Sequence, residues 1–147
     1  MPSESIRASG QTPSLDLGLL VGRILLVAIF PISGYYKAIA VPRTTGYFAS
    51  LGAPMPGVAV WIAILAEFLL PILVLLGVRT RWAAIGLILY TLGTSLIGHR
   101  FWDFDAGTQY AQYFGNLMHF MKNLCMVAGL ALLALLGPGR YAVQPRP

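Results

Sequence analysis

Ionisable side chains inside long apolar stretches are the residues of this sequence best suited to chemistry. Arg23, Glu67 and Lys122 stand in such stretches, with His119 and Asn123 close to Lys122. A charge within a bilayer costs about 2.5 to 3.5 kcal/mol on insertion scales, so it usually faces a protein interior or cavity and finds a partner there. Glu67 or His119 can pass protons. Lys122 can stabilise charge on an oxygen, with Arg23 as a second cation and Asn123 as a hydrogen-bond donor.

The depths of these residues allow them to meet. At 1.5 Å rise per residue, Arg23 lies about 9 Å, Glu67 about 15 Å and Lys122 about 21 Å from the same end of the predicted helices. We therefore expect Glu67 to be within reach of both cations. The three charges sum to +1, so either Lys122 is neutral or an anionic group completes the site. A reduced quinone or a phospholipid phosphate would supply that anion.

Polar residues near the candidates recur at helical spacing, which places them on shared faces. One stripe contains Asn116, His119, Lys122 or Asn123, and Met126. A shorter stripe contains Thr91, Thr94, Ser95 and Gly98, and His99 follows it in an interfacial position. Together the two stripes predict a pocket that opens toward the non-cytoplasmic face of the membrane.

Composition puts these stretches in a membrane. Of the 147 residues, 57% are hydrophobic and 10% charged, whereas soluble chains are about 25% charged. Each of four apolar stretches approaches the length of about 20 residues that a helix needs to cross the bilayer. They run from Leu17 to Ala40, Val58 to Leu76, Trp82 to Ile97 and Tyr113 to Leu136. The sequence thus predicts an all-α protein, a transmembrane antiparallel four-helix bundle, with a kink at Pro31 in the first span.

The connections and tails complete the predicted organisation. Thr44 to Leu51 is expected to form a short interfacial helix between the first two spans. The segment "GVRTR" predicts a tight turn, and Arg100 to Gln112 a polar, aromatic loop. Residues 1–14 are expected to be a disordered cytoplasmic tail, residues 15–141 the transmembrane domain, and residues 142–147 a second cytoplasmic tail.

The distribution of basic residues predicts the orientation. One side of the membrane collects Arg7, Arg79, Arg81, Arg140 and Arg146, and the other has Arg43, Arg100 and Lys37 with two aspartates. The positive-inside rule therefore places both termini in the cytoplasm. Lys37 is expected to snorkel outward, and snorkelling toward headgroups is an alternative to a functional role for Arg23. Lipid headgroups account for the net charge of +5 without a nucleic-acid partner.

The single cysteine removes several chemistries. Cys125 has no partner within the chain for a CxxC pair, an internal disulfide or a thiolate metal cluster. We expect it to be a small buried hydrophobic residue and expect no metal site. No haem-ligand, flavin or nucleotide motif is present in the sequence.

Several motifs, in their order and spacing, resemble the DoxX family of small bacterial membrane proteins across almost all of residues 16 to 141. They are "GRILLVAIFPISGYYK", "YFASLGAP", "AEFLLPILVLLGVRTRWAA" and "MKNLCMVAGLALLALLGPGRY". The shared positions include Gly22, Arg23, Phe30, Ser33, Gly34, Lys37, Glu67, Thr80 and Arg81. The resemblance implies a four-helix protein of the bacterial inner membrane. It also implies partners, because relatives belong to a quinol-oxidising complex, a thiosulfate:quinone oxidoreductase and oxidative-stress assemblies.

Alternatives of different classes stay open. The first is an accessory subunit of a quinone-linked redox assembly, with a quinone or lipid pocket built from Glu67, His119, Lys122, Asn123 and Arg23. The second is a non-catalytic scaffold whose buried charges are structural and whose loop from Arg100 to Gln112 docks other membrane or periplasmic subunits. A small transporter is the third, disfavoured because four spans without an inverted repeat offer little machinery for alternating access. No residue is assigned a catalytic role.

Overall fold

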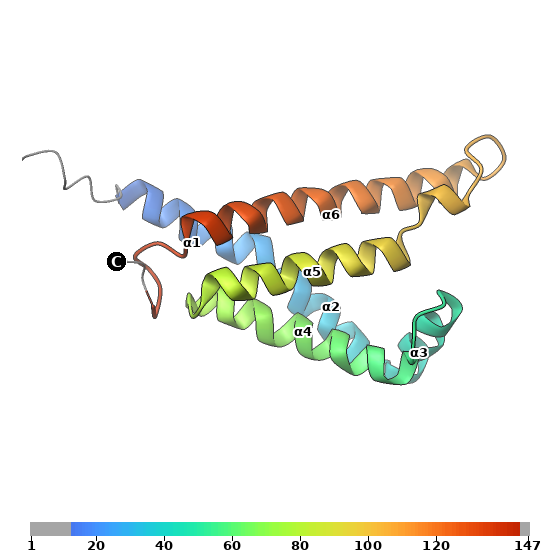
Figure 1. The fold of residues 1–147 in the computed structure, drawn as a ribbon, viewed down its shortest axis with the longest axis horizontal. Helices are drawn as coiled ribbons and strands as arrows, with labels where there is room; N and C mark the ends of the chain where they lie inside the picture. The colour runs from blue at the N-terminus through green and yellow to red at the C-terminus, as the bar shows by residue number, and fades with distance from the viewer. Residues whose placement is uncertain (1–12, 145–147) are drawn as a thin grey trace, which may run out of the picture.

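Residues 13–144 are described by the computed structural model, in which helices run side by side and are joined by short connections (Figure 1). In chain order the elements are α1 Pro13–Val27, α2 Ile29–Ala38, α3 Val41–Ser50, α4 Pro56–Leu76, α5 Thr80–Gly98, the 3-10 turn η1 Phe101–Asp103 and α6 Tyr110–Leu136. Four segments are long and apolar enough to span a membrane: Pro13–Ala38, Pro56–Leu76, Thr80–Asp103 and Tyr110–Leu136. The predicted all-α membrane bundle is confirmed. Residues 1–12 and 145–147, and with them most of both predicted tails, lie outside the described residues.

The first span consists of two helices. α1 begins at Pro13, so the helix includes the last two residues of the predicted N-terminal tail, and it ends at Val27. α2 begins at Ile29, two residues before Pro31. Pro31 has no N–H to donate to the Val27 carbonyl, and its ring crowds that carbonyl. The break lies where the sequence predicted a kink.

The connection between the first two spans contains the predicted short helix. α3 runs from Val41 to Ser50, three residues earlier than expected, because Pro42 in its first turn needs no hydrogen-bond partner for its nitrogen. Gly52, with a φ of 74°, follows its end. No residue of α3 is buried, which suits an amphipathic helix at a membrane interface.

A tight turn joins α4 to α5, as predicted. The Val78 amide donates to the Leu73 carbonyl at 2.9 Å, and the Gly77 amide donates to Val74 at 3.2 Å. Gly77 has a φ of 71°, a left-handed conformation that glycine adopts without strain. These are the bonds of a Schellman motif, which ends α4 and reverses the chain.

The helix bundle is closed at one end and open at the other. We call the end that carries Pro13, the α4–α5 turn and residues 137–144 the terminal end, and the end that carries α3 and η1 the loop end (Figure 1). α1 contacts both α4 and α6, whereas no residue of α2 lies within 8 Å of α6 between Cα atoms. The packed core therefore lies mainly toward the terminal end. It contains Val27, Phe30, Val74, Ala83, Ala84, Leu87, Leu130 and Leu133.

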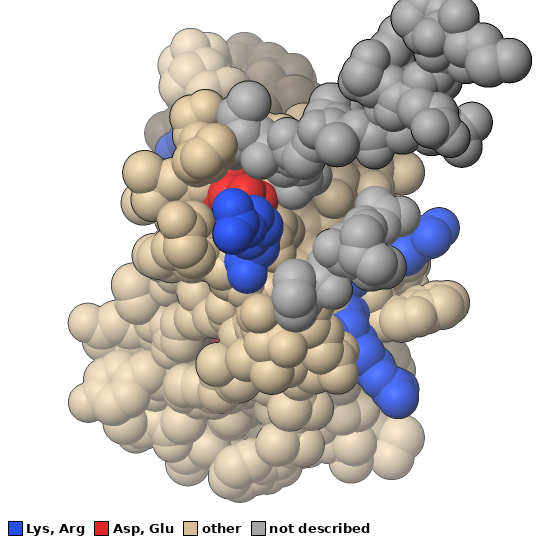
Figure 2. All heavy atoms as spheres, turned by 90° about the vertical axis from the view of Figure 1, so that its left-hand side faces the viewer, with Lys and Arg blue, Asp and Glu red and all other residues tan. Residues whose placement is uncertain are grey.

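The chain after α6 folds back over the terminal end. The Val143 amide donates to the Leu76 carbonyl at 2.8 Å, and the Arg140 amide donates to Asp16 Oδ1 at 3.0 Å. Viewed from this end, basic side chains stand around a face that is otherwise mostly uncharged (Figure 2). The exposed arginines among the described residues at this end are Arg79, Arg81 and Arg140.

Aromatic contacts order the loop end. The Phe101 ring lies 5.6 Å from Phe120 and 5.9 Å from Tyr113 between centroids, both edge to face. Trp102 contacts the same Phe120 ring at 5.9 Å. Edge-to-face pairs of this kind stabilise a structure by about 0.5 to 1.5 kcal/mol beyond their burial. They hold η1 against α6, which continues past the last turn of α5.

Candidate ligand-binding site

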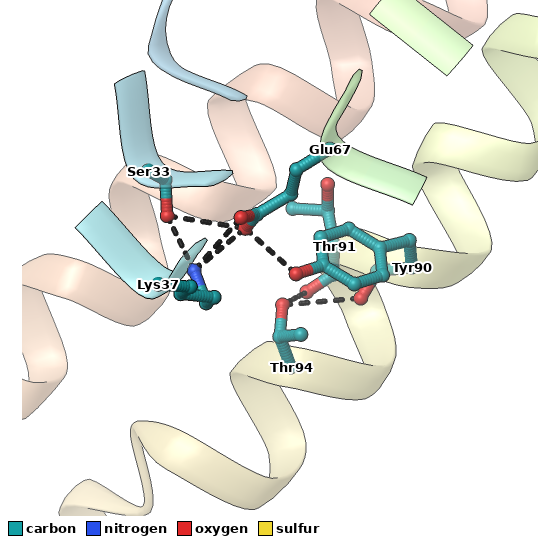
Figure 3. Close-up of polar contacts among 6 residues, drawn as sticks. All are labelled: Ser33, Lys37, Glu67, Tyr90, Thr91 and Thr94. Atoms are coloured by element: carbon teal, nitrogen blue, oxygen red, sulfur yellow. Dashed lines mark hydrogen bonds and ion pairs between the residues drawn. The ribbon is translucent and has the colours of Figure 1, made fainter. Parts of the chain in front are cut away.

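The Glu67 carboxylate is the centre of a hydrogen-bonded cluster formed by three helices. Its side chain is 5% exposed, and Lys37 Nζ lies 2.8 Å from Oε1 and 2.9 Å from Oε2. Tyr90 Oη donates to Oε1 at 2.7 Å, and Ser33 Oγ donates to it at 3.1 Å. Figure 3 shows these side chains converging from α2, α4 and α5. Glu67 thus has the charge partner and hydrogen bonds that a carboxylate needs away from water.

The local sequence explains why α2 comes so close to α4. A Cβ added at Gly34 would lie 3.0 Å from the Phe68 ring and 3.2 Å from Glu67 Cβ, so any larger residue here would force its neighbours on α4 to shift. Ser33 and Lys37, four residues apart, lie on one face of α2, and Lys37 Nζ also donates to Ser33 Oγ at 2.5 Å. Small residues allow close helix packing in membranes.

The expectation that Lys37 snorkels outward is wrong. Its side chain is only 20% exposed and supplies the cation that Glu67 needs. Two signals in the sequence pointed to it: its spacing of four from Ser33, and its place among the DoxX-like positions. Tyr90, which the sequence analysis also missed, left a weaker signal, since a hydroxyl in the middle of a span needs a partner.

Lys122, the predicted cation near Glu67, lies elsewhere. Its side chain is exposed on α6 and does not line the cavity around Glu67. The predicted stripe allowed either Lys122 or its neighbour, and α6 turns Asn123 inward instead. Lys122 lies about 18 Å from the Tyr110 end of α6. Because α6 extends past α5 at the loop end, the flexible side chain of Lys122 can snorkel toward the headgroups there.

Arg23 is buried at the terminal end, apart from Glu67. It is 1% exposed, and its guanidinium donates to the Val74 carbonyl at 3.4 Å through Nη1 and to the Tyr141 carbonyl through Nη2. Arg23 therefore ties α1 to the end of α4 and to the chain after α6. Neither the predicted contact with Glu67 nor snorkelling to headgroups describes this side chain.

These positions change the predicted charge balance. Glu67 and Lys37 form a neutral pair, and Arg23 and Lys122 do not contribute to the cavity. The excess positive charge that the sequence analysis assigned to one site is therefore divided among separate places. An anion is not required beside Glu67.

A cavity of about 690 Å³ extends from Glu67 toward the loop end. Its volume lies within the range of about 300 to 1,000 Å³ that is typical of small-molecule sites. Ser33 and Lys37 line one side and Tyr90 another, with Tyr47 and Phe48 of α3 near the loop end. Most of the lining is apolar, with a few polar groups placed within it, as in ligand sites generally.

α6 contributes a polar wall to the same cavity. His119, Asn123 and Met126 line it, and they follow the predicted stripe. Asn123 Nδ2 donates to Ser95 Oγ on α5 at 2.8 Å. The His119 ring stacks on His99, with 4.9 Å between centroids and 13° between the planes. Of the five predicted site residues, Glu67, His119 and Asn123 thus share the cavity.

One polar atom beside the cavity has no partner. Thr91 lines the cavity and is 1% exposed, yet its hydroxyl makes no hydrogen bond. A buried hydroxyl without a partner costs about 1 to 3 kcal/mol.

The structure also places the single cysteine and the potential metal ligands. Cys125 is exposed rather than buried. Among residues 13–144, no group of three or more histidine, cysteine or acidic side chains lies close enough to hold a metal ion.

Comparison with known proteins places the chain in a family. The family model named DoxX matches residues 18–100. The chain belongs to the DoxX family. Inner membrane protein YphA of Escherichia coli is 41% identical over 128 residues, which cover 87% of this chain and 89% of the relative. Inner membrane protein YqjF of the same organism is 34% identical over 129 residues, 88% and 91% of the two chains. No solved structure gives a significant match.

Membership of the DoxX family agrees with the architecture, a multi-pass protein of the inner membrane. The DoxX match covers Ser33, Gly34, Lys37 and Glu67. These are the residues that bring α2 against α4 and form the charged cluster. His119 and Asn123 lie beyond the matched range, on the opposite wall of the cavity.

Proposed function

We propose that this DoxX-family protein is an accessory subunit of a membrane redox assembly and binds the headgroup of a quinone in the cavity beside Glu67. The observation that supports this most is the group of donors, Lys37 and Tyr90, at the wall of a mainly apolar cavity within the bilayer. A quinone carries carbonyl oxygens on a flat apolar ring, so it needs a few donors in apolar surroundings. The Lys37–Glu67 pair is neutral, and a neutral quinone does not disturb that balance.

The residues have distinct roles in this proposal. On binding, Lys37 Nζ turns the N–H that it gives to Ser33 toward a headgroup oxygen, and Tyr90 turns its one O–H from Glu67 toward the same oxygen. Glu67 keeps its bonds to Lys37 and Ser33. His119 or Asn123 contacts the other side of the ring. Reduction of a quinone takes up protons, and Glu67 or His119 passes them. The electrons come from a partner subunit.

Retention of quinone tests the proposal. We expect wild-type protein purified in mild detergent to contain quinone, detected by mass spectrometry of an organic extract. Lys37→Met should reduce the content about tenfold or more, since the loss of one strong donor changes binding by about 1.4 kcal/mol or more. Tyr90→Phe should reduce it without breaking the ion pair.

Lys122→Met is the matched control, because Lys122 is exposed outside the cavity. It should retain quinone at the wild-type level. Quinone-free wild-type protein, or equal quinone content in the Lys37 and Lys122 variants, contradicts the proposal.

A second function, that of a non-catalytic scaffold, is favoured by the completeness of the Glu67 cluster. Lys37, Ser33 and Tyr90 all donate to the carboxylate and join three helices. In this proposal the cluster fixes the bundle, while the loop between α5 and α6 docks another subunit. The scaffold function predicts that Tyr90→Phe lowers stability and assembly while quinone is absent from wild-type protein.

A further inference from the structure

The cavity reaches the molecular surface between α4 and α5. These helices are joined at the terminal end and diverge toward the loop end (Figure 1). Val58 and Ile62 lie four residues apart on α4, and Leu89, Gly93 and Ile97 lie four apart on α5; all five line the cavity. The four apolar side chains among them are also exposed, by 48, 60, 66 and 40% in chain order. Residues that both line a cavity and are exposed mark an opening, and this group forms the opening that we call the mouth. Ile29 of α2, and Tyr47 and Met55 at the loop end, also line the cavity and are exposed, so the mouth is one of several openings.

This mouth faces the hydrocarbon of the bilayer. Leu89 lies nine residues after the start of α5, and Glu67 lies nine residues before the end of α4. Both are therefore about 14 Å from the terminal end at 1.5 Å per residue, near the middle of a hydrocarbon core about 30 Å thick. The mouth begins at the level of the Glu67 carboxylate and continues toward the loop end.

The opposite side of the cavity has a different chemistry. No Cα atom of α2 lies within 8 Å of a Cα atom of α6, and Ile29 of α2, which lines the cavity, is 52% exposed. Lys37 and His119 belong to these two helices and line that side. A hydrocarbon chain that passed between α2 and α6 would separate the polar groups of Lys37 and His119 from their partners or from water, which is unfavourable. The mouth between α4 and α5 has only apolar residues and Gly93 at its rim.

We infer that the ligand is a tailed, lipid-phase molecule whose headgroup lies at the Lys37–Glu67 cluster and whose hydrocarbon chain leaves through the mouth between α4 and α5. This inference rests on the proposed function and names the class of quinone, one with an alkyl or isoprenoid chain. The ligand then reaches the site from the leaflet at the loop end. Binding of the chain follows from apolar contact at the rim residues.

Gly93 offers a way to close the mouth without disturbing the helix packing. A Cβ added there would meet no atom within 4 Å, and leucine is a better helix former than glycine. Gly93→Leu should therefore fold and place its side chain in the mouth. Gly22→Leu is the matched control. A Cβ added at Gly22 also meets no atom within 4 Å, and this residue is exposed on α1 and lies outside the cavity.

The experiment compares decyl-substituted benzoquinone with the same benzoquinone without its chain, by equilibrium titration of the protein in lipid nanodiscs. We expect Gly93→Leu to weaken binding of the decyl compound about tenfold or more and binding of the chain-free compound by less than about twofold. The two changes in binding free energy then differ by about 1 kcal/mol. Gly22→Leu should leave both affinities unchanged. Partition of the decyl compound into lipid is the same for every variant, so it cancels when the affinities of the variants are compared with that of the wild type.

Different failures have different meanings. If wild-type protein binds neither compound, the proposed function is wrong, and the inference with it. If both compounds bind and Gly93→Leu affects neither, or weakens them equally, the route between α4 and α5 is wrong while quinone binding stands. Selective loss of the decyl compound in Ile29→Trp, with Gly93→Leu unaffected, would instead place the chain between α2 and α6.

Discussion

Two lysines of this chain show that a shift of one position along a helix changes the direction in which a side chain points. Lys37 is mostly buried against Glu67, whereas Lys122 is exposed on α6, and its neighbour Asn123 lines the cavity instead. Neighbouring residues on a helix are about 100° apart, so a single step moves a side chain from the cavity to the lipid. The cation that pairs with Glu67 is therefore Lys37.

The Lys37–Glu67 pair should dominate stability among these charges. We expect Lys37→Met to destabilise the protein by about 3 kcal/mol, because it leaves a buried carboxylate without a cation. Thermal unfolding in detergent measures this. The double variant Lys37→Met, Glu67→Gln should recover most of the loss, since no buried charge is left alone.

Lys122→Met is the control and should change stability by less than about 0.5 kcal/mol, as surface substitutions usually do. If the Lys37 and Lys122 variants unfold at the same temperature, the ion pair contributes nothing to the fold, and the scaffold function loses its main support.

Part of the site could be predicted from the sequence. Polar groups inside apolar spans need an interior, which predicts a site for Glu67, His119 and Asn123, and all three line the cavity. Lys122 and Arg23 met the same criterion and lie elsewhere, because depth alone does not fix the direction in which a residue points. The Arg23 Nη atoms donate to backbone carbonyls, one of them at Tyr141, more than a hundred residues away. No sequence pattern near Arg23 predicts such a distant partner.

At the scale of elements, hydrophobicity gave the four spans, and tertiary contacts determined their details. The Pro31 break and the Gly77 turn follow from backbone chemistry that is local in sequence. The approach of α2 to α4 at Gly34 depends on Phe68, which belongs to another span. The sequence shows that residue 34 is a glycine, but only the packed structure shows that Phe68 and Glu67 of α4 lie against it.

The contact at Gly34 should control whether the cluster forms. Gly34→Val should separate α2 from α4, since even a Cβ there lies 3.0 Å from the Phe68 ring. We expect a loss of about 2 kcal/mol in stability from overpacking and, under the proposed function, loss of bound quinone. Gly22→Val, where a Cβ meets no atom within 4 Å, should leave both unchanged. Equal unfolding temperatures for the two variants in detergent would contradict the close packing of α2 on α4.

At the scale of the whole molecule, stability and ligand binding are expected at opposite ends. The terminal end has the core contacts of α1 with α4 and α6 and the chain that folds back after α6. The loop end is open and has the cavity. The side of the membrane that each end faces therefore decides from which leaflet a ligand reaches Glu67.

The basic residues predict the orientation, which can be measured directly. Arg79, Arg81 and Arg140 are exposed at the terminal end, and the positive-inside rule predicts that this end is cytoplasmic. In a Cys125→Ser background, which removes an exposed thiol, a membrane-impermeant maleimide added to spheroplasts should label Asp105→Cys at the loop end. Val143→Cys, which is 68% exposed as valine, should react only after the membrane is permeabilised. The opposite labelling pattern would place the terminal end outside and the cavity in the cytoplasmic leaflet, and would contradict the orientation predicted from the basic residues.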